Sequence, residues 1–144
     1  MQDFVHLHVH TQYSLLDGQA SVARLVDKAM KNGMKGIAVT DHGNMFGIKE
    51  FTNYVNKKNS GPKGEVKDLK KRIAGIEAGT IECEDKEAEI AACKAKIVEA
   101  ENKLFKPIIG CEMYVARRTM DLKEGKPDQS GYHLIVLAKT ETGY

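Results

Sequence analysis

The sequence is poor in the residues that define several classes of protein. It contains no tryptophan, aromatic residues make up 6% of it, and cysteine occurs three times, at Cys83, Cys93 and Cys111. Their odd number and wide spacing exclude both a disulfide framework and a Cys-x-x-Cys metal site, so reduced thiols are the simplest interpretation. With so few aromatic residues, a hydrophobic core would have to be mostly aliphatic.

Long apolar runs and charge of one sign are lacking as well. No segment approaches the ~20 consecutive apolar residues of a transmembrane helix. The first residues, MQDFVHLHVH, have neither the basic start nor the apolar run of a signal peptide. Lys and Arg total 22 against 20 Asp and Glu, and a net charge of +2 gives no electrostatic argument for or against nucleic acid as a partner. We therefore expect no membrane association, and one domain at most in 144 residues.

Histidine is concentrated in the stretch FVHLHVHTQYSLLDG, residues 4–18. His6, His8 and His10 alternate with aliphatic residues, so they would share one face of a strand. Neutral imidazole is the commonest metal ligand near pH 7. The pattern predicts a packed strand that carries a metal site at its end, followed by a turn to Asp17 and Gly18.

Two strand–helix units follow from the apolar spacing. Ser21 is a candidate N-cap for a helix over residues 22–30, which Asn32-Gly33 would end. A buried strand, residues 36–40, precedes a second helix over about 45–57. This order is typical of a parallel sheet or a β/α barrel, whose functional sites lie at the C-terminal ends of the strands. The histidine pair would end the first strand there, and Asp41-His42 the second.

Residues 58–106 differ in composition from the rest. We expect a linker-like turn over residues 59–64 and then two helices with heptad-like apolar spacing, joined at Gly79-Thr80 in an antiparallel hairpin. The apolar seams are Val66, Leu69, Ile73 and Ile76 in the first helix, and Ile90, Cys93, Ile97, Ala100 and Leu104 in the second. Their charged outer faces would be solvated, or would form a docking surface for another domain or subunit.

The last part of the chain predicts two more strands, over residues 108–115 and 133–138. Glu112 lies within the first of them and, once buried, needs a metal, a strong hydrogen bond or a cation such as Arg117 or Arg118. A polar loop, residues 117–131, separates the two strands. The chain stops at Tyr144, where a helix would be expected to begin, so we expect a fragment of a longer protein.

Six residues together provide nitrogen and oxygen ligands without a thiolate: His8, His10, Asp17, His42, Glu112 and His133. This set suits Zn²⁺, Mn²⁺ or Fe, and a bridging carboxylate suits a site of two or three ions. Such sites lower the pKa of bound water and clamp the oxygens of an in-line displacement, so the reaction class is phosphoester hydrolysis. Asp41 is a candidate for orienting a metal-ligating imidazole through a hydrogen bond, without binding the metal itself.

Each candidate also has a structural interpretation. His6, near the start of its strand, is more readily a structural histidine than a ligand. Asp17 and Asp41-His42 could be turn residues alone. His133 opens a strand instead of ending one, so its position in the pattern does not place it in the site.

Four ordered stretches resemble the polymerase-and-histidinol-phosphatase (PHP) domain found at the start of bacterial replicative DNA polymerases. They are FVHLHVHTQYSLLDG, GIAVTDHGNMFGIKEF, KPIIGCEMYVA and YHLIVLAKTETGY. The resemblance implies an α/β fold: residues 1–144 would be the N-terminal part of a distorted (β/α)₇ barrel, interrupted by the inserted hairpin of residues 58–106. It also implies that all six residues, His133 included, ligate metal, and that further ligands lie beyond residue 144.

The resemblance implies a function for the complete protein. The parent chain would be a DNA-directed DNA polymerase, a bacterial cytoplasmic enzyme with Mg²⁺ at a polymerase site absent here. Its partners would be DNA, other replicase subunits, a proofreading exonuclease and a sliding clamp. The domain itself would be a Zn²⁺- or Mn²⁺-dependent phosphoesterase, a 3′–5′ exonuclease, whose site is incomplete and inactive in this fragment. The alternatives are a metal-stabilised structural module that docks a proofreading subunit, and a free-standing histidinol-phosphatase-like enzyme.

Overall fold

The computed structural model describes residues 4–144, and these form two compact units. One consists of the chain up to Val55 together with Lys106–Tyr144, and the other is Asn56–Phe105. Because their mutual placement is not determined, each unit is described by itself. Among the described residues, no helix has the length and apolar character needed to cross a membrane.

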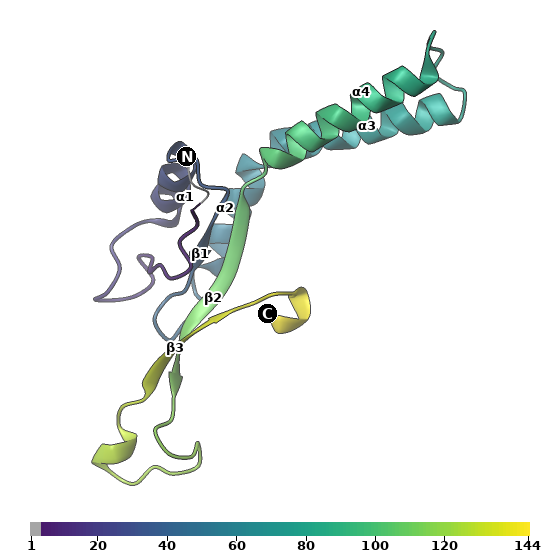
Figure 1. The fold of residues 1–144 in the computed structure, drawn as a ribbon. Helices are drawn as coiled ribbons and strands as arrows, with labels where there is room; N and C mark the ends of the chain where they lie inside the picture. Colours follow the sequence, from purple (N-terminus) through teal and green to yellow (C-terminus); the bar gives the residue numbers. More distant parts are fainter. Residues whose placement is uncertain (1–3) are drawn as a thin grey trace. The chain divides into compact units, whose positions relative to one another are not determined.

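The first unit is built on a three-stranded sheet in the order β1-β2-β3 (Figure 1). The strands are β1, Gly36–Val39; β2, Lys106–Val115; and β3, Tyr132–Leu137. The first half of β2 pairs in parallel with β1, and its second half pairs antiparallel with β3. The parallel sheet that the sequence predicts from the first two strand–helix units therefore does not extend to β3. This reversal brings the start of β3 beside the end of β2.

The expected first strand, residues 4–10, is not a regular strand. The segment runs beside β1 through two backbone hydrogen bonds, from Ala38 N–H to His6 O and from Thr40 N–H to Val9 O, each 2.9 Å. Between these two bonds the N-terminal segment advances by three residues, from His6 to Val9, while the β1 segment advances by two, from Ala38 to Thr40. This offset resembles a β-bulge and interrupts the regular ladder of hydrogen bonds. His6 is consequently separated from the simple alternation that relates His8 to His10.

Two helices accompany the sheet in this unit, α1, Val22–Lys31, and α2, Ile48–Lys58, of which the first 8 residues belong here. The Ser21 side chain caps α1 and Gly33 follows it with φ +76°, as the sequence predicts. α2 begins later than expected because the Asn44 side chain accepts from Phe46 N–H at 3.1 Å and holds a turn. The core, aliphatic except for Phe51, is formed by Val22, Val26, Ala29, Ile37, Ala38, Val39, Ile48, Phe51 and Val55.

The second unit contains α3, Ser60–Glu77, and α4, Lys86–Asn102, which pack against each other (Figure 1). The linker predicted over residues 59–64 is wrong, because α3 already begins at Ser60. Pro62 lies in the first turn of α3, where a backbone N–H would have no acceptor within the helix, so proline is tolerated there. Asn59, just before it, is buried and exchanges side-chain hydrogen bonds of 2.8 and 2.9 Å with the backbone of Phe105.

The apolar seam of these two helices follows the predicted spacing. Its buried members are Ile76, Cys93, Ile97 and Ala100, while Glu87, Glu99 and Glu101 of α4 are exposed. Asp85 caps α4 by accepting from Ala88 N–H at 3.0 Å. All three cysteines are free, as the sequence predicts. The mixed α/β class is confirmed, while the distorted (β/α)₇ barrel, of which this chain would form a part, remains a prediction.

Candidate metal centre

Glu112 lies at the centre of a cluster of imidazoles in the first unit. It is 7% exposed, and it sits in the middle of β2, where an isolated bridge joins it to His42 just past the end of β1. Its two oxygens face different histidines: His10 Nε2 is 2.6 Å from Oε2, and His133 Nδ1 is 2.7 Å from Oε1. A buried carboxylate with an imidazole at each oxygen is the arrangement expected of a bridging ligand.

His8 and His10 approach Glu112 from the N-terminal segment. Their rings meet edge to face with centroids 4.9 Å apart. His8 Nδ1 is 2.8 Å from the Thr40 hydroxyl, and its other ring nitrogen, Nε2, is 3.8 Å from Glu112 Oε2. The fully buried Thr40 hydroxyl also accepts from Val9 N–H at 2.9 Å, so one side chain fixes both the ring and the backbone beside it.

His42 enters the cluster from the turn after β1. Its Nδ1 is 2.6 Å from Asp17 Oδ2, and its Nε2 hydrogen-bonds the Tyr114 hydroxyl. Because Asp17 contacts the His42 ring, it reaches the cluster through His42. Gly43, the next residue, has φ +65°, and a Cβ there would come within 2.7 Å of the Tyr114 ring.

His133 joins the cluster because β3 runs antiparallel to β2. The register pairs His133 with Tyr114, two residues beyond Glu112, and opposed residues of an antiparallel pair point to the same face of the sheet. His133, at the start of β3, therefore lies beside the C-terminal end of β2, on the same face of the sheet as Glu112. His6 lies outside this cluster, with its exposed ring against Phe4.

Asp41 has partners other than the imidazole of our hypothesis. Its buried carboxylate accepts from Thr11 N–H at 2.6 Å, from the Thr11 hydroxyl at 2.8 Å and from the Ser14 hydroxyl at 2.6 Å. Ser14 in turn accepts from His42 N–H at 3.0 Å. Asp41 thus holds the turn after His10 and positions the backbone of His42. Gly18 closes the same turn, and a Cβ at this position would lie 2.1 Å from Thr11 O.

The electrostatics of the cluster favour an ionised Glu112. Burial by itself raises the pKa of this carboxyl, but hydrogen bonds from His10 and His133, together with the charge of His10 and His42, outweigh burial and lower it. The charged form is the one that binds a cation.

Among residues 4–144, the side chains form two groups that could hold a metal ion, and both include Glu112. His8, His10 and Glu112 form one, and His42, Glu112 and His133 the other, with the ligand atoms in each group within 4.8 Å of one another. These nitrogen and oxygen donors, with no thiolate among them, fit Zn²⁺, Mn²⁺ or Fe. A carboxylate shared by two groups fits a site with more than one ion.

Sequence reasoning missed three residues that support the cluster: Thr40, Ser14 and Tyr114. Tyr114 could have been found, because it follows Glu112 by two residues on one strand and so faces the same side. Thr40 and Ser14 act through hydrogen bonds to residues about 30 positions away, and no local pattern marks such contacts.

Comparison with known proteins places this chain among relatives of one kind. A protein-family model described as "PHP domain" matches residues 6–97. Three similar proteins carry the name "DNA polymerase III subunit alpha". Those of Treponema pallidum and Borreliella burgdorferi are each 39% identical over 98% of this chain, and that of Aquifex aeolicus is 31% identical over 99% of it. The chain spans only 8–9% of the length of these relatives.

Proposed function

Because the chain belongs to the PHP domain family, we propose that it forms the N-terminal part of a PHP domain in a bacterial replicative DNA polymerase. Within residues 1–144, residues 58–106 would be an inserted helical hairpin. DNA and the other replicase subunits would be the partners of the complete protein. These assignments rest on relatives that are about twelve times longer than this chain.

For the domain itself we propose metal-dependent phosphoester hydrolysis, with the 3′ end of DNA as substrate. The observation that carries this proposal is Glu112, a buried carboxylate shared by two groups of potential ligands. His8 and His10 would hold one ion and His42 and His133 another, with Glu112 between them and Asp17 beside His42. Zn²⁺ or Mn²⁺ bound there would act as a Lewis acid on the phosphoester oxygens.

The remaining residues would keep these ligands in place. Thr40 holds the Nδ1 side of His8, which leaves the Nε2 side turned toward Glu112. Asp41, through Ser14, fixes the backbone of His42. The Tyr114 hydroxyl hydrogen-bonds His42 and would help to orient its ring. Hydrogen bonds of this kind preserve ligand geometry and make binding less costly in conformational entropy.

A nuclease assay on the complete protein tests the proposal. The substrate is a primer with a mismatched 3′ terminus, supplied with Mn²⁺ or Zn²⁺ and without deoxynucleoside triphosphates. We expect metal-dependent removal of terminal nucleotides, at least about 100-fold slower in His10→Ala. His6→Ala is the matched control, because this imidazole lies on the same segment outside the cluster. Equal rates in the two variants would contradict the assignment.

A structural role for the metal is a second candidate, favoured by where the ligands come from. The potential ligands belong to four separate segments, which bound metal would cross-link: the N-terminal segment with His8 and His10, the turn with His42, β2 with Glu112 and β3 with His133. In that case the metal would stabilise the domain, which would dock a separate proofreading subunit. Metal-dependent protection of these segments from hydrogen exchange, with no nuclease activity and with binding of an exonuclease subunit, would favour this role.

A further inference from the structure

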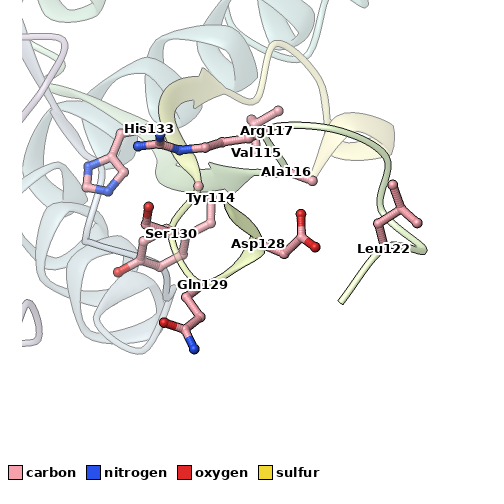
Figure 2. A pocket seen from close by; sticks show the side chains of 10 residues that line it. Tyr114, Val115, Ala116, Arg117, Leu122, Asp128, Gln129, Ser130 and His133 are labelled. Atoms are coloured by element: carbon pink, nitrogen blue, oxygen red, sulfur yellow. The ribbon is translucent and has the colours of Figure 1, made fainter. Parts of the chain in front are cut away.

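A pocket adjoins the metal cluster on the side of the loop between β2 and β3. Its volume is about 490 Å³, within the range of ligand-binding cavities. Figure 2 shows the side chains that line it, which come from the end of β2, the loop and the start of β3. The lining residues important here are Tyr114, Arg117, Leu122, Gln129 and His133.

The pocket and the metal cluster share two residues. His133 lines the pocket and also contacts Glu112 at 2.7 Å, while Tyr114 lines it and hydrogen-bonds His42. The two rings lie edge to face, with centroids 5.1 Å apart. A substrate whose scissile phosphate lies at the cluster would therefore extend its neighbouring group past these rings into the pocket.

The charges in the pocket favour an anion. The one carboxylate in the lining, Asp128, accepts from Arg118 Nε at 2.9 Å and from Glu124 N–H at 2.6 Å, so its charge is already balanced. Arg118 also lowers the pKa of Asp128 through that hydrogen bond. Within residues 4–144, Arg117 forms no ion pair, and its guanidinium stacks 5.3 Å from the centre of the Tyr132 ring. Stacking orients a guanidinium without neutralising it.

We propose that this pocket binds the terminal nucleotide of a single-stranded nucleic acid, with Arg117 on a phosphate oxygen. The base would lie against the exposed Tyr114 ring and the Leu122 side chain, with the Gln129 amide available to its polar edge. Aromatic faces accept any base, so such a pocket selects for a nucleotide without selecting a sequence. The proposal rests on the proposed function for the position of the scissile bond, while binding itself does not require hydrolysis.

Photo-cross-linking of the complete protein locates the nucleotide independently of activity. The probe is an oligothymidylate that carries 4-thiothymidine at its 3′ end, and cross-linked peptides are identified by mass spectrometry. We expect cross-links within residues 114–133, about tenfold weaker in Arg117→Ala and partly restored in Arg117→Lys. Lys123→Ala, an exposed cation of the same loop outside the pocket, should cross-link like wild type. Cross-links only elsewhere, or equal yields in the two alanine variants, would overturn the proposal.

Kinetics separate failure of the pocket from failure of the proposed function. Arg117→Ala should raise KM for a single-stranded oligonucleotide about tenfold, whereas Lys123→Ala should leave that KM within about twofold of wild type. Leu122→Trp, which fills the pocket without removing charge, should raise KM as Arg117→Ala does. If wild type does not hydrolyse the oligonucleotide, the proposed function fails and the cross-links still decide on the pocket. If wild type hydrolyses it and Arg117→Ala and Lys123→Ala have the same KM, the pocket proposal fails alone.

Discussion

The metal cluster and the α3–α4 hairpin are held together by different kinds of contact. In the cluster, buried polar groups join residues far apart in sequence, as between His10 and Glu112, 102 positions apart. In the hairpin, apolar residues at regular spacing pack between two neighbouring helices, and the ion pairs are exposed. The cluster therefore depends on the geometry of single hydrogen bonds, whereas the hairpin depends on a repeated pattern that tolerates surface changes.

The largest expected difference between the two regions is their response to metal. At a metal concentration of about 100 times Kd, we expect the amides around Glu112 in β2 to exchange about 100-fold more slowly, because opening there would release the ion. The amides of α3 and α4 should be unchanged. Hydrogen exchange with mass spectrometry measures both regions in one sample of the complete protein.

Glu112→Gln and Glu99→Gln are the matched variants for this measurement. Glu112→Gln keeps the shape of the side chain but removes the shared negative charge, so the metal-dependent protection should disappear. Glu99, on the exposed face of α4, should be replaceable without effect on it. Protection that persists in Glu112→Gln would place the metal elsewhere.

Glycine-to-alanine changes should have opposite signs in the two regions. At Gly18 a Cβ would lie 2.1 Å from Thr11 O and 2.8 Å from Thr11 C, so Gly18→Ala should destabilise the turn by about 2–4 kcal/mol. At Gly64, within α3, a Cβ would meet no atom within 4 Å, and Gly64→Ala should stabilise the helix by about 0.5–1 kcal/mol. Exchange protection of the surrounding amides measures both changes. The same sign at both sites would contradict the comparison.

Loss of one buried hydroxyl in the cluster should have a moderate effect. Thr40→Val leaves Val9 N–H and His8 Nδ1 without their partner, at a cost of about 1–3 kcal/mol, and should weaken metal binding about tenfold. Thr52→Val is the control, since that hydroxyl lies within hydrogen-bond distance of the Ile48 and Lys49 carbonyls of its own helix. Isothermal titration with Zn²⁺ distinguishes the two. Equal metal affinities would mean that the Thr40 hydroxyl does not position His8.

The smallest effect is expected at the exposed ion pairs of the hairpin. Arg72 Nη2 lies 2.9 Å from Glu89 Oε1, and both side chains are more than a third exposed. Arg72→Ala should therefore destabilise α3 and α4 by about 0.5 kcal/mol or less, and the difference should vanish in 1 M salt. Exchange rates of the α4 amides at low and high salt test this. A loss of several kcal/mol would show that the hairpin also depends on specific polar contacts.

The sequence predicts the regions with local patterns better than it predicts the site. The spacing of Ile76, Cys93 and Ile97 predicts the buried seam, and Ser21 predicts the start of α1. Helix periodicity and capping are properties of neighbouring residues, so they can be detected in one chain. The expected linker before α3 is wrong for a local reason as well: glycine and proline are tolerated in a first helical turn.

The arrangement of the site depends on pairing between distant segments. Strand pattern alone does not place His133, because the direction of β3 relative to β2 is set by tertiary contacts. The irregular path of residues 4–10 depends likewise on the two hydrogen bonds to the β1 segment. The Asp41 carboxylate, next to a candidate ligand in the sequence, accepts hydrogen bonds from Thr11 and Ser14, which lie about 30 positions away, so its role depends on tertiary contacts as well.

The most direct test of the account is the metal content of the complete protein and three of its histidine variants. After incubation with Zn²⁺ or Mn²⁺ and dialysis, bound metal is measured by inductively coupled plasma mass spectrometry. We expect less bound metal in His10→Ala and in His133→Ala, which lie in different ligand groups, and wild-type content in His6→Ala. Equal metal content in all four proteins would contradict the claim that this cluster binds metal.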